Sequence, residues 1–557
     1  MPDTNGTNES GKARRESIGV ALSGGGHRAT IFGLGALLYL TDAGLNRSVR
    51  SITSVSGGSI LNGFLGLLDK PFNAQSADEF EEHASRLAEQ IAGHPKYWAG
   101  TAGFSVPALV LITILACRFH SGMMWAYALV LILVVGEAGS RSKGSMWAWR
   151  GTWIYLSSVL VATVAALFYV VQGPAWQRWL GAAILLLCGM AFAQRSAVTS
   201  MAFGASCCRL ANNGKRSGRD RLEDLNDEVT HIICATEMHS GQHFFFLRNC
   251  VYSPGVGVGT SGGLHLRAAM QASANVPIAF PFRLIRSSRF RFGVWDQTRI
   301  PSGPTPIDTS PAEGLVKGVP RLFRLCDGGV FDNLAVSWFL KARIRFQNIE
   351  SYLFFLSESK GHVEKVYGRD HEDALSEKLQ AGRAALAALW SPDRIIVING
   401  GKTPVWRNRI SGWIPGVREL LESSEVFNVM YDNTQSERLH ELQYRFAKTS
   451  ASGAVVDMAE VAVPPWATDC VGEVERRRNE YLEQCAWPRV DIDALEKFVK
   501  SNATVPTTLR PLGHEKTAEL LHHGYLQAMI SLHVRMGAPL LAAPDRERFL
   551  KLASRHK

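Results

Sequence analysis

The sequence predicts a three-layer α/β domain that is interrupted by an α-helical transmembrane insert. Short apolar runs typical of buried strands end in glycine turns and lead into helical segments, which is the pattern of an α/β sheet. Between these parts, four apolar runs with very few charges lie between Trp98 and Gln194. Each is near the ~20 residues that cross a bilayer, or somewhat shorter.

The chain of 557 residues exceeds what a single hydrophobic core usually holds, so we expect several units. Its first residues are polar and lack the apolar centre of a secretory signal, which favours a disordered tail. The predicted division is a disordered tail at 1–16, the first part of the α/β domain at 17–97, the transmembrane insert of about four helices at 98–194, the second part of the domain at 195–540 and a C-terminal tail at 541–557.

Charge and cysteine content narrow the class of partner. The formal net charge is +10, and basic residues cluster near the apolar block, as in Lys215, Arg216, Arg219 and Arg221. We therefore expect an anionic lipid surface rather than nucleic acid as the partner. The nine cysteines are scattered, unlike a disulfide framework or a zinc site, and indicate reduced thiols and no metal. The sequence does not indicate the oligomeric state.

The candidate membrane spans are Trp98 to Cys117, Met123 to Ala138, Thr152 to Val171 and Trp176 to Ala193. The alternative is a set of buried helices in a soluble protein, which would carry charged residues on one face at helical spacing. Runs such as YALVLILVV have no such face. Tryptophans near the run ends also favour insertion, because their rings prefer the membrane interface. A site that joins residues from both sides of the insert requires an even number of crossings, which four or two satisfy.

The loops between the runs orient this insert. The middle loop holds Arg141, Lys143 and Arg150, whereas the outer turns hold Arg118 and Arg178. Since basic loops stay on the cytoplasmic side, we expect a multi-pass membrane protein whose α/β domain lies at the cytoplasmic face.

A glycine turn follows the first apolar strand in IGVALSGGGHRA, Ile18 to Ala29, and precedes an apolar helical segment. This geometry presents free backbone amides at a helix N-terminus to an anion, and Arg28 would add a fixed positive charge. The turn could cradle a nucleotide phosphate or be only a tight turn, but neither GxxxxGK[ST] nor GxGxxG occurs there.

A second sharp turn surrounds Ser56 in SITSVSGGSILNGFLG, after a short β-branched strand. The sequence is close to the GxSxG nucleophile elbow, in which small neighbours allow the serine a strained backbone and an exposed hydroxyl. Here Ser54 replaces the first glycine.

A third turn begins at Asp327 in RLFRLCDGGVFDNLAV. A carboxylate at a strand end can reach a serine hydroxyl on a neighbouring strand and remove its proton. The alternative for such an aspartate is to cap the turn, a role for which Asp332 and Asn333 are better placed.

In this order, SGGGHR, SVSGGS and DGGVFDN resemble the motifs of the patatin-like phospholipase family, which uses a Ser/Asp dyad without a histidine. HIICATEMHSGQHFFF from His231, LRAAMQASANVPIAFPF from Leu266 and the C-terminal TAELLHHGYLQAMISL are also similar to family segments. The resemblance covers roughly 17–360 outside the insert. It implies a patatin-like catalytic domain, with Ser56 as nucleophile and Asp327 as base.

The resemblance also implies that Gly24, Gly25, Gly26 and Arg28 form the oxyanion hole and that no metal or organic cofactor is needed. His27 lies inside the oxyanion loop and does not fit a triad base. The histidines His522, His523 and His533 have no carboxylate or cysteine at ligand spacing.

These observations predict a membrane-anchored serine hydrolase that cleaves acyl esters of lipids, of the phospholipase A or lysophospholipase type. Membrane phospholipid is the first expected substrate and partner, with lysophospholipid or neutral lipid after it. An alternative is a catalytically silent membrane protein that binds lipid or a regulatory partner, which Ser54 keeps open. A small transporter is disfavoured because we expect no charged residue within the membrane beyond Glu137, which lies near the end of a run. Further along the chain we expect strands at Ser351 to Ser357 and Arg394 to Gly400, and a helix from Tyr431.

Overall fold

The computed structural model describes residues 16–93, 211, 220–254, 256–277, 282–290, 320–340, 392–401, 434–446, 452–461, 472–484, 492–507, 511–542 and 544–554. The predicted transmembrane insert at 98–194, most of the predicted N-terminal tail and the predicted strand at 351–357 lie outside these residues. Within the described ranges, no helix combines the length and the apolar character that crossing a bilayer requires.

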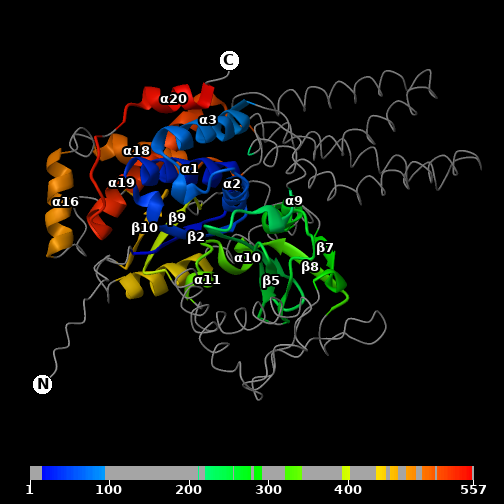
Figure 1. The fold of residues 1–557 in the computed structure, drawn as a ribbon. Coiled ribbons are helices and arrows are strands. Elements are labelled where there is room, and N and C mark those ends of the chain that lie inside the picture. The colour runs from blue at the N-terminus through cyan, green and yellow to red at the C-terminus, as the bar shows by residue number, and fades with distance from the viewer. Residues whose placement is uncertain are drawn as a thin grey trace, which may run out of the picture.

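One mixed sheet organises the domain, with strand order β10-β9-β1-β2-β3-β4-β5-β6 (Figure 1). Neighbours from β10 to β3 are parallel, and the remaining pairs are antiparallel. The strands are β1 Ile18–Leu22, β2 Val49–Val55, β3 Thr230–Glu237, β4 Gln242–Phe246, β5 Cys250–Ser253, β6 Gly257–Thr260, β7 Arg283–Arg286, β8 Leu322–Asp327, β9 Arg394–Asn399 and β10 Gly453–Asp457. The strand predicted at Arg394 to Gly400 is confirmed as β9.

Helices cover both faces of this sheet. The helices are α1 Gly26–Asp42, α2 Gly57–Gly66, α3 Ala77–Gly93, α9 Leu266–Ala274, α10 Gly329–Asp332, α11 Ser337–Leu340, α16 Glu473–Gln484, α18 Ile492–Ala503, α19 His514–Met536 and α20 Arg546–Ser554, with 3-10 turns at Leu45–Ser48, Phe72–Ala74, Leu222–Asp224 and Ser287–Arg289. Residues 434–446, where a helix from Tyr431 was predicted, are also helical.

Alternate residues of the parallel strands point to two separate cores, because successive side chains of a strand face opposite ways. Val20 and Leu22 of β1 join a core with α1, α2, α3, α19 and α20. Ala21, between them, joins a second core with α11 and the helix at 434–446. Buried on both faces, these strands are near-continuous apolar runs, as parallel strands usually are. The described part therefore has the three layers that the sequence predicts.

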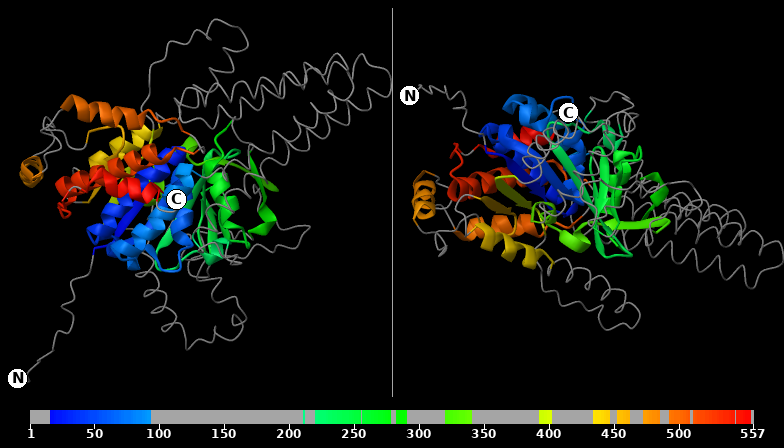
Figure 2. Two further views of the ribbon diagram at one scale, coloured as in Figure 1. Left: turned by 90° about the horizontal axis from the view of Figure 1, so that it is seen from above. Right: turned by 60° about the horizontal axis from the view of Figure 1, so that its bottom comes forward.

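Helix α1 crosses α19 at a distance that only glycine permits. A Cβ on Gly35 of α1 would lie 2.1 Å from the carbonyl oxygen of Leu521, and a Cβ on Gly524 of α19 would lie 2.0 Å from that of Phe32. Figure 2 shows α1 and α19 against the same side of the sheet. The C-terminal helix thus closes over the helix that follows the glycine turn.

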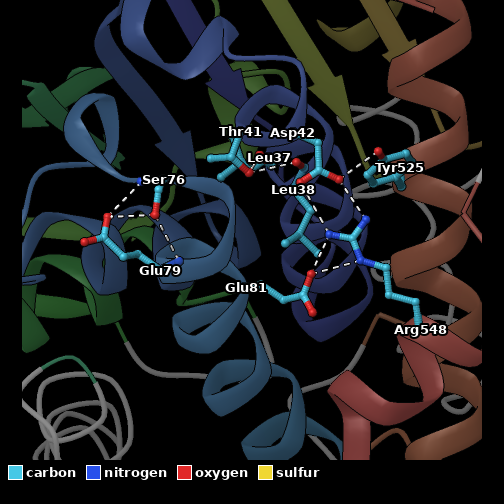
Figure 3. Close-up of polar contacts among 9 residues, drawn as sticks. All are labelled: Leu37, Leu38, Thr41, Asp42, Ser76, Glu79, Glu81, Tyr525 and Arg548. Carbon is cyan, nitrogen blue, oxygen red and sulfur yellow. Dashed lines mark hydrogen bonds and ion pairs between the residues drawn. The ribbon is translucent and has the colours of Figure 1, made fainter. Parts of the chain in front are cut away.

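The predicted C-terminal tail at 541–557 contains helix α20, which is a correction to the sequence interpretation. Its nine residues carry too few apolar positions for periodicity to reveal them, yet Phe549 and Leu552 are buried. Arg548 of α20 donates to Asp42 of α1 at 2.7 Å and to Glu81 of α3 at 2.9 Å (Figure 3). Tyr525 of α19 donates to the same Asp42 at 2.8 Å.

Helix α3 begins with a capping box, also drawn in Figure 3. The Glu79 carboxylate accepts the backbone N–H of Ser76 at 2.9 Å, and the Ser76 hydroxyl accepts the N–H of Glu79 at 3.3 Å.

Candidate active site

Ser56 sits between β2 and α2 in a backbone conformation that residues with a side chain rarely adopt. Its φ is 52° and its ψ is −117°, and such strain persists where the surrounding structure enforces it. A Cβ on Gly57 would lie 2.1 Å from the carbonyl oxygen of Gly26, and a Cβ on Gly58 would lie 2.4 Å from that of Leu22. The turn at Ser56 is therefore the sharp elbow that the sequence predicts, pressed against the glycine turn.

The pairing of β3 places Asp327 beside Ser56. On one edge, β3 pairs with β4 over Ile233 to Glu237. Strand β8 pairs with β3 over Ala235 to Glu237, so it must occupy the other edge. Strand β2 pairs with the same edge of β3, but only as far as Cys234. Strands β2 and β8 thus run toward each other along one edge of β3, and Ser56 and Asp327 stand where they meet.

The Ser56 hydroxyl lies close enough to the Asp327 carboxylate to lower its pKa. The backbone N–H of Gly329 donates a hydrogen bond to the same carboxylate at 2.8 Å. Asp327 is 1% exposed. Burial raises the pKa of its carboxyl to about 7, although the Ser56 hydroxyl and the Gly329 N–H both lower it. A base with a pKa near the working pH combines ionisation with proton affinity.

The glycine turn before α1 lies against this pair. Gly25 and Gly26 have φ values of 142° and 62°, which favour glycine. Their amides donate no hydrogen bond to any residue that the structure describes. The amide of Gly24, by contrast, donates to the carbonyl of Asn333 at 3.0 Å. Of the three glycines predicted for the oxyanion hole, Gly25 and Gly26 therefore have amides available to an oxyanion.

Gly24 has a different use. A Cβ there would lie 2.3 Å from Oδ1 of Asn333 and 3.2 Å from the Cβ of Ser56. The residue is glycine because the chain passes this close to the nucleophile.

The Arg28 side chain hydrogen-bonds to backbone carbonyls, and its predicted part in the oxyanion hole stays a prediction. Its guanidinium donates to the carbonyl of Gly400 through Nε at 3.1 Å and Nη2 at 3.0 Å, and through Nη1 to the carbonyls of Ala503 and Val505. Burial lowers the pKa of Arg28 to about 10, which leaves it charged at neutral pH. A cation with five N–H donors can satisfy several carbonyls at once, so Arg28 holds the turn from behind.

Asp332 has the capping role predicted for it. Its two carboxylate oxygens accept the backbone N–H groups of Leu334 at 3.1 Å and Ser337 at 2.7 Å. Asn333 extends this turn by donating to Gln435 at 3.2 Å.

The histidines considered above lie in packed surroundings. His27 is buried in the first turn of α1. His523 packs edge-on against Phe32, and His522 stacks on Phe549. In the described ranges, no group of three or more His, Cys, Asp or Glu side chains could hold a metal ion.

The sequence model of the patatin-like phospholipase family matches residues 20–339. The chain belongs to this family. The match extends from the first strand to α11 and includes the glycine turn, the Ser56 elbow and Asp327. Membership assigns lipid acyl hydrolysis as the general activity. No curated protein matches the chain in sequence.

This patatin-like elbow accommodates Ser54 through a buried polar network. The Ser54 hydroxyl donates to the carbonyl of Ile232 at 3.2 Å and accepts from Asn62 at 2.8 Å and Ser59 at 3.0 Å. Because Ser54, Ser59 and Asn62 are all buried, Ser54 is part of a hydrogen-bonded network in the core beneath the elbow.

Ser273 of α9 supports the nucleophile itself, a role that sequence reasoning missed. Its hydroxyl accepts the backbone N–H of Ser56 at 3.0 Å and donates to the carbonyl of Cys234 at 2.6 Å. It also lies 2.8 Å from the hydroxyl of Ser59. Ser273 lies in the segment LRAAMQASANVPIAFPF that resembles the family, but the sequence of this segment alone does not tell where the Ser273 hydroxyl points.

Proposed function

We propose that the protein is a serine lipid acyl hydrolase, of the phospholipase A or lysophospholipase type, which cleaves acyl esters through a Ser56/Asp327 dyad. The observation that carries the proposal is the juxtaposition of Ser56, at a strained elbow, with the buried carboxylate of Asp327 where β2 and β8 meet on β3.

In the first step, Asp327 takes the proton of Ser56 as Oγ attacks the ester carbonyl. The amides of Gly25 and Gly26 donate to the oxyanion, and each such donor contributes on the order of 3 kcal/mol to lowering the barrier. The intermediate collapses to an acyl-enzyme, and the alcohol leaves with the proton from Asp327. In the second step, water gives a proton to Asp327 and attacks the acyl group. The fatty acid departs, and Ser56 regains its proton. These steps use no metal or organic cofactor.

The sequence supports a membrane setting for this chemistry. The apolar runs at 98–194 would anchor the protein as a multi-pass membrane protein, with the hydrolase domain at the cytoplasmic face and acyl lipids of the inner leaflet as substrate. Phospholipid is the first expected substrate class.

The contacts of Ser54 favour an active enzyme over a silent lipid-binding protein. A silent protein would not need a buried carboxylate beside a strained serine, or two glycine amides next to them. The replacement of the motif's first glycine by Ser54 had kept that alternative open. Hydrogen bonds of Ser54 to Asn62, Ser59 and Ile232 now explain it.

The test is fatty acid release from mixed phospholipid vesicles by the full-length protein purified in detergent, together with labelling by a fluorophosphonate. Ser56→Ala and Asp327→Asn are each expected to abolish release. Asp457→Asn is the control, because this carboxyl is partly buried, burial raises its pKa to about 6, and it accepts hydrogen bonds from Asn399 and Ala459. Release by Asp327→Asn at the parent rate, or neither release nor labelling by the parent, would refute the proposal.

A further inference from the structure

Exposed apolar side chains gather at one place on the described surface. Six large hydrophobic residues are exposed, and four of them belong to β7, β8 or the residues beside them: Leu284 at 56%, Leu322 at 42%, Phe282 at 39% and Met238 at 37%. Single exposed apolar residues are ordinary, but a contiguous group marks a contact surface.

The strand register puts these side chains on one face. Leu284 of β7 pairs with Arg324 of β8, and Arg286 of β7 pairs with Leu322 of β8. Directly opposed residues of neighbouring strands share a face, as do residues two apart on one strand. On the other edge of β8, Met238 donates its backbone N–H to the carbonyl of Arg324 at 2.9 Å. Met238, Leu284, Arg286, Leu322 and Arg324 form what we call the β7–β8 face.

The β7–β8 face is also basic, because it includes Arg286 and Arg324, and Arg289 and Arg321 are exposed beside it. In the described part of the chain, none of these four arginines forms an ion pair with an acidic residue. Burial lowers the pKa of the neighbouring Arg283, and the charges of Arg289 and Arg267 lower it further. Arginines alone could serve to protect an edge strand from pairing, but leucines between them work against that use.

We propose that the β7–β8 face docks on an anionic phospholipid surface. This inference rests on the proposed function, and it identifies the surface through which the protein would bind the membrane that contains its substrate. Leucine side chains enter the acyl boundary while arginine stems lie along it, with guanidinium groups at lipid phosphates. Arg324 stands three residues before Asp327 on β8, so docking brings the dyad to the membrane. Figure 1 shows β7 and β8 together at the end of the domain far from α16.

The expected contribution of the arginines follows from their charge. Each basic residue near an anionic leaflet strengthens binding about fivefold, so Arg286→Gln with Arg324→Gln would shift the docking equilibrium roughly 30-fold toward the undocked state. High salt should do the same in the parent, since screening weakens exposed charges.

A fluorophore that senses its environment, attached at Leu284→Cys in the full-length protein, reports docking without catalysis. The parent chain, treated in parallel, gives the background. We expect a blue shift with vesicles of phosphatidylcholine mixed with phosphatidylglycerol and little shift with phosphatidylcholine alone. Tyr444→Cys is the matched probe, because Tyr444 is 65% exposed and lies on the helix at 434–446. Arg445→Gln, at an exposed arginine beside it, is the matched charge control.

Three outcomes would overturn the inference. The probe at Leu284 could respond no more than the probe at Tyr444. The blue shift could be equal with neutral lipid, or it could grow with protein concentration without lipid, which would indicate a protein partner. A different pattern separates failure of the proposed function: docking would persist, but the parent would show neither fluorophosphonate labelling nor fatty acid release.

Discussion

Replacing Asp327 with asparagine should abolish hydrolysis and yet stabilise the protein at alkaline pH. Burial raises the pKa of Asp327 from 3.8 to about 7, so the native protein keeps a proton that the unfolded chain releases between these pH values. The stability that this proton contributes is complete below the unfolded pKa and is lost as the pH rises through the folded pKa. Asparagine has a similar shape and does not titrate.

The magnitude follows from two pH units of ionisation between pH 5 and the folded pKa of about 7. At about 1.4 kcal/mol per unit, the stability of Asp327→Asn relative to the parent should grow by about 3 kcal/mol between pH 5 and pH 8. For a cooperative unit of a few hundred residues this is a rise of about 4 °C in the difference between melting temperatures.

The assay is thermal unfolding of the parent and of Asp327→Asn in the same detergent at several pH values. Asp457→Asn serves as the comparison, because Asp457 is a partly buried carboxyl whose pKa is also raised. A difference in melting temperature between Asp327→Asn and the parent that stays constant from pH 5 to pH 8 would show that Asp327 is not held near neutrality by burial. The same titration predicts that the parent's kcat/KM rises with pH through about 7, because the base must be ionised to take a proton.

Three further substitutions test the support of the site. Ser54→Gly restores the ordinary elbow motif but removes a buried acceptor that both Asn62 and Ser59 use, so we expect a loss of about 2 kcal/mol in denaturant unfolding rather than a gain. Gly57→Ala should lose fluorophosphonate labelling, because its Cβ would lie 2.1 Å from the Gly26 carbonyl oxygen, and labelling at the parent rate would contradict this packing. Arg28→Lys cannot replace the guanidinium's hydrogen bonds to three carbonyls and should lower stability by about 3 kcal/mol in the same measurement.

The features predicted well from the sequence are local ones. Strand, elbow and helix around Ser56 follow one another within a few residues, so the small side chains and the β-branched run determine the turn directly. The same holds for the glycine turn before α1 and for the capping by Asp332.

The features that were missed depend on distant partners. The carbonyls to which Arg28 donates belong to segments around Gly400 and Val505, and no pattern in the sequence near Arg28 predicts these hydrogen bonds. The amide of Gly24 is occupied because Asn333 is brought to it by the sheet. Ser273 supports Ser56 across 217 residues of sequence, and α20 owes its order to packing on α3 and α19 rather than to its own apolar periodicity.

The hydrogen bonds from Arg28 to distant carbonyls determine when, during synthesis of the chain, the glycine turn can be held in place. A growing chain contains Ser56 and Asp327 long before it contains the carbonyls that hold the glycine turn, which lie 372 to 477 residues beyond Arg28. Until then α1 also lacks the cover of α19, against which its glycine packs. The nascent chain therefore carries Ser56 and Asp327 before it contains the segments that hold the glycine turn and cover α1.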